Sequence, residues 1–188
     1  MYVTPRVEVA ATANSPRLVL RSWRESDADA LCEAHRDVTL RHYSTHHLDT
    51  TADALAWIRD REVERAAGAG FAFAVTGAEA GADGPRPLGN VLLKGVAVGK
   101  PTAEVGYWTA PHARGLGVAP RAVEAVTAWA FETLRPAGLE RLELRHQSDN
   151  EPSCRVALKC GYALTGILAP HPPDFPLDGH LHVRRSDG

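Results

Sequence analysis

A glycine-rich segment at residues 114–119, RGLGVA, lies between a predicted strand and a predicted helix. Glycine has no Cβ, so the backbone there can pass close to a ligand, and the first amides of a helix have no acceptor within the helix. The helix dipole adds a preference of about 0.3–1 kcal/mol for an anion at this end. Residue types and position therefore indicate a cradle for a diphosphate group.

Other interpretations of the segment compete with this one. A dinucleotide-binding fingerprint would need a third glycine at Pro120 and would follow the strand directly, whereas residues 110–114 intervene. A P-loop would end in Gly-Lys followed by Ser or Thr, which this segment does not. A glycine-rich turn that only starts a helix is the commoner structure, so the segment by itself does not decide.

A second motif lies at residues 150–162, NEPSCRVALKCGY. The two motifs together resemble the GNAT superfamily of acyltransferases, which carries Gln/Arg-x-x-Gly-x-Gly/Ala at a helix start and later Asn-x-x-Ala-x-x-Leu-Tyr-x-Lys-x-Gly-Phe. Ala157 stands where that superfamily often has a catalytic tyrosine, which excludes a tyrosine acid there, and Ser153 replaces the usual alanine. The matching positions are Arg114, Gly117, Ala119, Asn150, Ser153, Val156, Ala157, Lys159, Gly161 and Tyr162.

Further segments narrow the resemblance to one branch. LVLRSWRESDADAL, AEVGYW and LELRHQSDNEPS are similar to the ribosomal-protein N-acetyltransferases of the RimJ/RimL type. The likeness covers about residues 17–168, and the tail HLHVRRSDG departs from that branch. Because the tail and the first two helices help to build the acceptor pocket, the resemblance leaves the acceptor open.

The resemblance implies that acetyl-CoA lies in a cleft where two strands separate. Backbone groups of Trp108 and Thr109 would pair with the pantetheine arm like an added strand. Arg114 would add charge near the diphosphate, and Asn150 would bind pantetheine or simply form the turn after a strand. The diphosphate would be held by the amides of Gly115, Leu116, Gly117, Val118 and Ala119.

The expected chemistry is attack of a neutral amine on a thioester. Strand period two puts Glu104 on the same face as Trp108, where a carboxylate could take the amine proton through water, or form a salt bridge at the strand edge. The thioester oxygen would be stabilised by a backbone N–H near Thr109. Ser153 could donate to the leaving thiolate, with the capping of a helix as its alternative role.

Periodicity predicts an α+β fold of the GNAT type. We expect a mixed, mostly antiparallel sheet of six to seven strands, splayed between the fourth and fifth, with about four helices, in a single domain over 17–188 after an arm or edge strand at 1–16. Capping boxes are expected at Ser26 with Asp29 and at Thr50 with Asp53. The predicted strands are 17–23, 71–76, 87–99, 103–109, 141–147, 162–168 and 180–185, and the helices 27–37, 50–65, 116–134 and a short one ending at 161.

Composition limits the function classes. The chain has 188 residues with 21 Lys and Arg against 23 Asp and Glu, a formal charge of −2 that argues against general nucleic-acid binding. No apolar run is long enough to span a membrane, and the first residues lack a secretory signal. Cys32, Cys154 and Cys160 lack a CxxC pair and suggest free buried thiols in the cytoplasm.

Histidines offer two weaker candidates. His180 and His182 share a strand face, but the sequence shows no third ligand, so no metal is expected. The histidines of the segment between the first two helices are polar loop residues or flank the acceptor; they are His42, His46 and His47.

We therefore predict a cytoplasmic N-acetyltransferase that transfers the acetyl group of acetyl-CoA directly to a primary amine, first of all a protein N-terminus. A small-molecule amine such as a polyamine or antibiotic, and a non-catalytic acyl-CoA sensor, are the alternatives. A homodimer is expected from the resemblance only.

Overall fold

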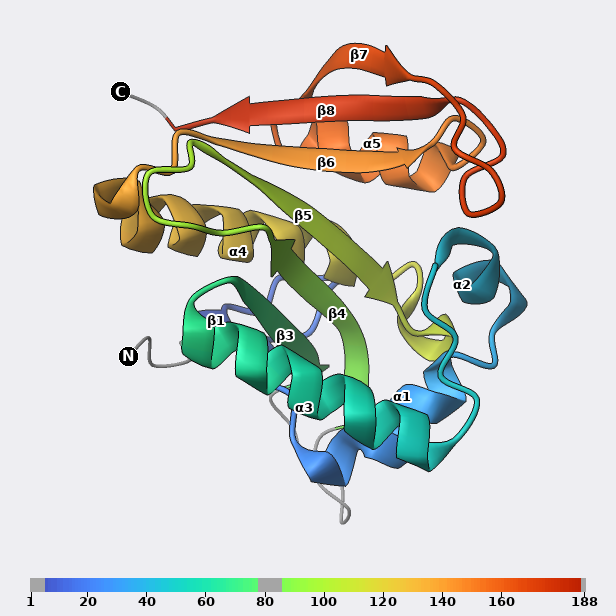
Figure 1. Ribbon diagram of the computed structural model, residues 1–188. Coiled ribbons are helices and arrows are strands. Elements are labelled where there is room, and N and C mark those ends of the chain that lie inside the picture. Colours follow the sequence, from blue (N-terminus) through green and yellow to red (C-terminus); the bar gives the residue numbers. More distant parts are fainter. Residues whose placement is uncertain (1–5, 78–85, 187–188) are drawn as a thin grey trace.

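The computed structural model describes residues 6–77 and 86–186, and it is built on one sheet (Figure 1). Its eight strands follow the order β1-β2-β3-β4-β5-β6-β8-β7. Neighbouring strands are antiparallel apart from β5 and β6, which are parallel. The strands are β1 (Val7–Val9), β2 (Leu18–Ser22), β3 (Gly70–Gly77), β4 (Pro87–Lys94), β5 (Thr102–Thr109), β6 (Arg141–Gln147), β7 (Ala163–Leu168) and β8 (Gly179–Arg185).

Helices cover both faces of this sheet, with α3 on one face and α4 on the other (Figure 1). In the described residues no helix combines the length and apolar character needed to cross a membrane. The α-helices are α1 (Ala28–Ala34), α2 (Val38–Tyr43), α3 (Thr51–Ala67), α4 (Val118–Leu134) and α5 (Glu151–Lys159); the 3-10 turns are η1 (Glu25–Asp27), η2 (Pro111–Ala113) and η3 (Arg135–Ala137).

Two apolar cores result from the alternation of side chains along the strands. In β3, Phe71 and Phe73 belong to the core beneath α4, while Ala72 and Ala74 belong to the core beneath α1 and α3. Trp129 of α4 packs on the two phenylalanines, with ring centroids 4.9 and 5.2 Å away. The two cores fix α4 and the α1–α3 layer on opposite sides of β5, the strand that carries the candidate site.

One expectation about the first residues is confirmed, one predicted helix boundary is wrong, and one predicted loop lies largely outside the described residues. In the segment 1–16, expected as an arm or an edge strand, residues 7–9 form the edge strand β1, which pairs with β2 and raises the strand number to eight. The predicted helix 27–37 is too long, because α1 ends at Ala34, and the chain from Val38 forms a separate helix, α2, that was not predicted. Residues 78–85, inside the loop expected at 77–87, lie outside the described residues.

Of the two expected capping boxes, one is confirmed. Thr50 Oγ1 accepts from the amide of Asp53 at 3.1 Å, and the Asp53 carboxylate accepts from Thr50 at 2.9 Å. The box expected at Ser26 with Asp29 is wrong, because the carboxylate of Asp27 accepts from the amide of Arg24 instead. Asp29 accepts from Thr51 of α3.

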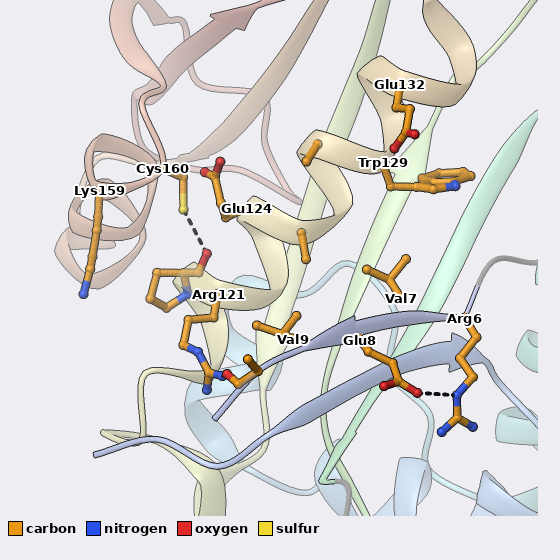
Figure 2. Close-up of a pocket in the computed structure, with 14 residues that line it drawn as sticks. Arg6, Val7, Glu8, Val9, Arg121, Glu124, Trp129, Glu132, Lys159 and Cys160 are labelled. Carbon is orange, nitrogen blue, oxygen red and sulfur yellow. Dashed lines mark hydrogen bonds and ion pairs between the residues drawn. The ribbon is translucent and has the colours of Figure 1, made fainter. Parts of the chain in front are cut away.

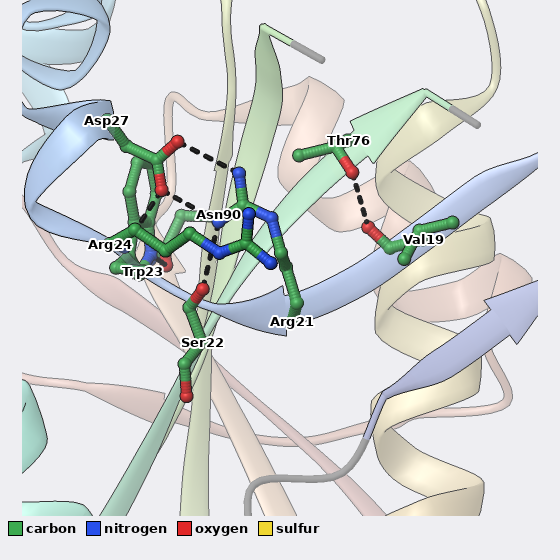
Figure 3. A network of polar contacts seen from close by, with 8 residues as sticks. All are labelled: Val19, Arg21, Ser22, Trp23, Arg24, Asp27, Thr76 and Asn90. Carbon is green, nitrogen blue, oxygen red and sulfur yellow. Dashed lines mark hydrogen bonds and ion pairs between the residues drawn. The ribbon is translucent and has the colours of Figure 1, made fainter. Parts of the chain in front are cut away.

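A buried polar network joins η1 to the sheet (Figure 3). Arg21 of β2 donates to both carboxylate oxygens of Asp27, at 2.7 and 2.8 Å. Trp23 donates its indole N–H to Asn90 Oδ1 at 2.9 Å, and Asn90 stands opposite Trp108 in the β4–β5 register. The network therefore holds η1, β2 and β4 together next to Trp108 of β5.

Candidate active site

A wedge opens in the sheet between β5 and β6. These parallel strands pair from Thr102 with Arg141 to Val105 with Leu144, and then β5 continues beside β4 while β6 continues beside β8 (Figure 1). Within the described sheet, the edge of β5 from 106 to 109 has no strand partner on this side. The predicted splay between the fourth and fifth predicted strands is thus confirmed.

The backbone of β5 alternates between β4 and the wedge. Ala110 donates its N–H to the carbonyl of Leu88 at 2.9 Å, and successive residues of an antiparallel pair direct their backbone groups to opposite sides. The N–H and C=O of Trp108 therefore face β4, whereas those of Tyr107 and Thr109 face the wedge. The Trp108 backbone therefore does not face the wedge, where it was expected to pair with a ligand, whereas Thr109 has the expected orientation; pairing of this strand with a ligand stays a prediction.

The loop before α4 exposes backbone amides at the mouth of this wedge. Gly115 and Gly117 have φ values of +78° and +67°, the left-handed region that favours glycine. Within the described residues, the amides of 115–117 donate to no acceptor. Helix α4, which includes Val118 and Ala119 in its first turn, has no side-chain cap there and no acidic residue. Bare amides at a positive helix end fit an anion.

The N-terminal segment borders this loop. An added Cβ at Gly117 would lie 2.9 Å from Ser15 Oγ, whereas one at Gly115 would meet nothing within 4 Å. Arg121 of α4 donates to the carbonyl of Pro16 at 2.7 Å. The loop is therefore supported on the side of Gly117 and open on the side of Gly115.

Helix α2 lies across the mouth of the wedge and contacts both of its sides. Asp37, which caps α2 by accepting from the amide of Leu40 at 2.8 Å, also pairs with Arg114. The Arg114 guanidinium holds the pKa of Asp37 below its usual range. At the other end, His42 lies 3.5 Å from the carboxylate of Asp149, just before α5. Arg114 is therefore not a free surface cation in this structure.

Ser153 occupies a built position on the opposite side of the wedge. It is buried in the first turn of α5, and its Oγ lies 2.9 Å from the hydroxyl of Tyr107 on β5. Asn150, not Ser153, caps α5, since Asn150 Oδ1 accepts from the Ser153 amide at 3.1 Å. Burial raises the pKa of Tyr107 to about 12, so its hydroxyl is protonated at neutral pH. The expected capping alternative for Ser153 is wrong.

Glu104 lies on the opposite face of β5 from Tyr107. Its carboxylate oxygens are 2.8 Å from Lys94 Nζ and 3.9 Å from Arg145. Lys94 is the register partner of Glu104 across β4 and β5. The salt bridge expected as the alternative role of Glu104 is therefore formed, and a role as base stays a prediction.

Aromatic rings line the same face of β5 beyond Glu104. The Trp108 ring lies 6.0 Å from Trp23 and 5.8 Å from His35 between ring centroids. His35 is 4% exposed, and burial lowers its pKa to about 4, so the ring is neutral. This wall of neutral rings borders the space beside β5.

A second hollow lies elsewhere, between β1 and the outer side of α4 (Figure 2). Apolar Val7, Val9 and Trp129 line it together with ionic groups such as Glu124 and Lys159. In the picture Cys160 is held by a bond from its thiol to the Pro120 carbonyl, at 3.2 Å. The lining of this hollow follows α4 from Pro120 to Glu132 and does not include residues 115–117.

The Acetyltransferase (GNAT) domain family matches residues 17–163. The chain belongs to the GNAT acetyltransferase family. It is therefore an acyltransferase enzyme, and the first interpretation of the glycine-rich segment, rather than the dinucleotide or P-loop alternatives, agrees with this family.

Similar proteins support the assignment. "Uncharacterized N-acetyltransferase YoaA" of Bacillus subtilis is 27% identical over 154 residues, 81% of this chain and 82% of that protein. The structure of RimL, a ribosomal L7/L12 alpha-N-protein acetyltransferase in complex with coenzyme A, has a TM-score of 0.78 and 16% identity, covering 95% of this chain and 97% of that one. The microcin C7 self-immunity acetyltransferase MccE, in complex with acetyl-CoA and AMP, has a TM-score of 0.78 and 16% identity over 93% and 98% of the two chains. The GNAT fold is thus shared.

Sequence reasoning missed two parts of the site. Tyr107 was not singled out, although the alternation that buries Ala103 and Val105 also directs Tyr107 towards α5. Helix α2 was missed because residues 38–43 follow the predicted helix 27–37 and were assigned to the segment between the first two helices, and its cap Asp37 was placed at the end of that predicted helix. The signal for Tyr107 was available in the period of two, whereas the contact between Asp37 and Arg114 joins residues far apart in the chain.

Proposed function

We propose that this enzyme transfers the acetyl group of acetyl-CoA directly to a primary α-amine, such as the N-terminus of a protein. The observation that carries the cofactor part is the loop of unpaired amides at 115–117, placed where the sheet divides. Neighbours of the same fold bind acetyl-CoA or coenzyme A, and RimL is a ribosomal-protein N-terminal acetyltransferase.

In this proposal the chain holds acetyl-CoA with its backbone. The backbone amides of residues 115–119 would bind the diphosphate. The Arg114 side chain would leave its ion pair with Asp37 and bind a phosphate oxygen instead. The wedge-facing backbone groups of Tyr107 and Thr109 would pair with the pantetheine arm. Asn150, beside Ser153, would contact the same arm through the amide group that its capping oxygen leaves available.

The protonation state of the acceptor favours an α-amine. At pH 7 deprotonating a lysine with a pKa near 10.4 costs about 4.6 kcal/mol, while an α-amine near 7.7–8.0 costs about 1–1.4 kcal/mol. The only carboxylate that we propose as base, Glu104, already contacts Lys94 and Arg145. A carboxylate engaged in two ion pairs is a weak base, and an α-amine is the acceptor that costs less to deprotonate. A water between the amine and Glu104 would carry the proton.

Ser153 and Tyr107 would stabilise the leaving thiolate by hydrogen bonding. A thiol has a pKa of about 8.5. Since the pKa of Tyr107 is raised to about 12, complete proton transfer from Tyr107 to the thiolate is uphill by about 5 kcal/mol. Tyr107 therefore donates to Ser153, Ser153 donates to the sulfur, and solvent supplies the final proton. The amide of Thr109 would face the thioester oxygen as charge develops.

The test follows the release of free coenzyme A thiol from acetyl-CoA. Acceptors are peptides with a free N-terminus, the same peptides with a blocked N-terminus and an internal lysine, and a polyamine. We expect thiol release with free N-termini only. Coenzyme A binding without acceptor-dependent thiol across the panel would instead favour a sensor.

A small-molecule amine is the second candidate, because MccE, a self-immunity acetyltransferase, shares the fold. A polyamine fits the described site poorly. Lys94 and Arg145 flank Glu104, so a polycation would meet like charges there. Faster thiol release with a polyamine than with any peptide would overturn the preference for a protein N-terminus.

A further inference from the structure

Four possible metal ligands gather where β6, β8 and α5 meet. His146 lies near the end of β6, His180 and His182 lie on β8, and Cys154 lies on α5. One ligand atom from each of these residues falls within 4.8 Å of all the others. His180 and His182 share a strand face as expected, and the structure adds the further ligands that the sequence did not reveal.

If the rings of His146 and His182 are both neutral and keep their bonds to backbone carbonyls, no hydrogen lies between their two Nε2 atoms. His146 Nδ1 lies 2.7 Å from the Gln147 carbonyl and His182 Nδ1 lies 3.2 Å from the Tyr162 carbonyl, so each Nδ1 carries the proton. Each Nε2 then presents a lone pair, yet the two Nε2 atoms are only 3.2 Å apart. Reversing one tautomer would only move the repulsion to a backbone carbonyl.

A metal ion resolves this arrangement. Zinc bonds imidazole nitrogen at about 2.0–2.1 Å, so two nitrogens of a tetrahedral site are roughly 3.3 Å apart. The observed 3.2 Å between the Nε2 atoms matches that spacing. Backbone carbonyls that hold the Nδ1 protons are the usual outer partners of metal-binding histidines.

The remaining two residues complete a coordination set. His180 Nδ1 is buried and has no hydrogen-bond partner among the described residues, which is costly unless something binds it. Cys154 is a free, half-buried cysteine whose sulfur is a ligand for zinc once it loses its proton. Three imidazoles and one thiolate suit a borderline-soft ion such as Zn²⁺ better than Mg²⁺ or Ca²⁺.

We propose that His146, Cys154, His180 and His182 form a tetrahedral zinc site that joins α5 to β6 and β8. The site is closed by four protein ligands and is therefore structural. Its ligand Cys154 directly follows Ser153, so the ion would fix the first turn of α5, and with it Ser153, against the C-terminal half of the sheet. The site does not depend on the proposed acceptor.

The experiment uses the full chain, purified with a reductant and stripped by a chelator. Titration with Zn²⁺ alone should give one tight site per chain and raise the Tm by about 5–10 °C at a hundredfold excess over Kd. Co²⁺ in place of Zn²⁺ should give the visible bands of a tetrahedral site together with a thiolate-to-cobalt charge-transfer band.

Matched variants assign the ligands. His180→Ala should weaken zinc binding more than about 100-fold, because the loss of a residue that binds the metal directly should exceed the loss on changing a residue that only supports a ligand. This substitution also breaks no hydrogen bond that the structure shows. Cys154→Ser should lose the charge-transfer band. Exposed His171 and buried Cys32 supply the controls, His171→Ala and Cys32→Ala, which should bind as the unmodified chain does.

Two results would overturn the site. One is a stripped unmodified chain that binds Zn²⁺ no more tightly than His180→Ala. The other is a Co²⁺ spectrum of the unmodified chain without the thiolate band, which decides the matter even where a variant does not fold.

Discussion

Helices α4 and α5 both begin at the wedge, but their first turns are built in opposite ways. In α5, residues of the chain itself complement the helix start, since Asn150 caps a backbone amide and the acidic Glu151 lies in the first turn. Helix α4 follows two glycines with positive φ and has neither a side-chain cap nor an acidic residue there. A satisfied helix start can present side chains such as Ser153, whereas a bare one can bind an external anion.

This difference assigns separate tasks to the two sides of the wedge. The side of α4 would bind the diphosphate, and the side of α5 would act on the thioester sulfur through Ser153. Arg114 and Asp37 form an ion pair, which coenzyme A would replace under this proposal. The following predictions alter one helix start at a time.

The largest effect should come from giving α4 a cap of its own. Gly117→Asp places a carboxylate where the diphosphate should bind, and Gly117→Asn adds a side chain of the same shape without the charge. Both crowd Ser15 equally, so their difference reports charge. We expect Gly117→Asp to weaken coenzyme A binding at least about 100-fold and at least about tenfold more than Gly117→Asn, measured by calorimetry. Equal affinities in the two variants would contradict an anion at this helix start.

The next effect concerns the side chain presented by α5. Ser153→Ala should lower kcat about 10²-fold with little change in the KM for acetyl-CoA, because the donor acts on the leaving thiolate. Tyr107→Phe should cost less, and the double variant should be no slower than Ser153→Ala alone, since Tyr107 acts through Ser153. Ser148→Ala is the control. Additive losses in the double variant would show that the two hydroxyls act separately.

Removing the existing cap of α5 should affect stability. Asn150→Ala leaves the Ser153 amide without its acceptor and should cost about 1 kcal/mol, or roughly 2–4 °C in Tm. Asn150→Asp keeps a capping oxygen and should retain the Tm. A raised KM for acetyl-CoA in Asn150→Asp would support a contact between this amide and the cofactor. Equal melting of all three proteins would contradict the capping role.

The smallest effect should come from the ion pair at the mouth of the wedge. Asp37→Asn keeps a good helix cap but removes the charge, and should cost about 0.2–1 kcal/mol of the free energy of unfolding at pH 7. Arg114 lowers the pKa of Asp37 in the folded chain, so this contribution is present above the unfolded pKa of about 3.9 and is lost as pH falls through the lowered value.

Denaturant unfolding at pH 7 and at pH 3 checks this sign. The gap between Asp37→Asn and the unmodified chain should narrow at the lower pH, while exposed Asp174→Asn should match the unmodified chain at both. A gap that does not shrink would mean that Asp37 acts through shape and not through charge.

Most of the fold followed from local patterns in the sequence. Alternation predicted the strands of the sheet, and the pair Thr50 and Asp53 predicted the start of α3, because these signals involve neighbouring residues. The cap at Ser26 was misplaced because the Asp27 carboxylate accepts from the Arg24 amide and is also bound by Arg21 of β2. The bond to Arg21 forms only once β2 and η1 have packed together.

The candidate site divides in the same way. The glycines at 115 and 117 and the pair Asn150 and Ser153 could be predicted, since each lies within one motif. The hydroxyl pair of Tyr107 and Ser153 and the cluster around His182 join different elements, so no local pattern predicts them. The expectation of acetyl-CoA came from the family resemblance, whereas the contacts between elements were visible only in the folded structure.

The central claim is that bare amides of the loop before α4 bind a diphosphate, and one matched pair of variants tests it. Gly115 and Gly99 have φ values of +78° and +75°, and an added Cβ at either position meets nothing within 4 Å. Alanine should therefore cost the two positions a similar amount of stability, about 1–2 kcal/mol. In calorimetric titration with coenzyme A, the account predicts that Gly115→Ala binds at least about tenfold more weakly than Gly99→Ala, a difference of about 1.4 kcal/mol. Equal affinity of the two folded variants would contradict it.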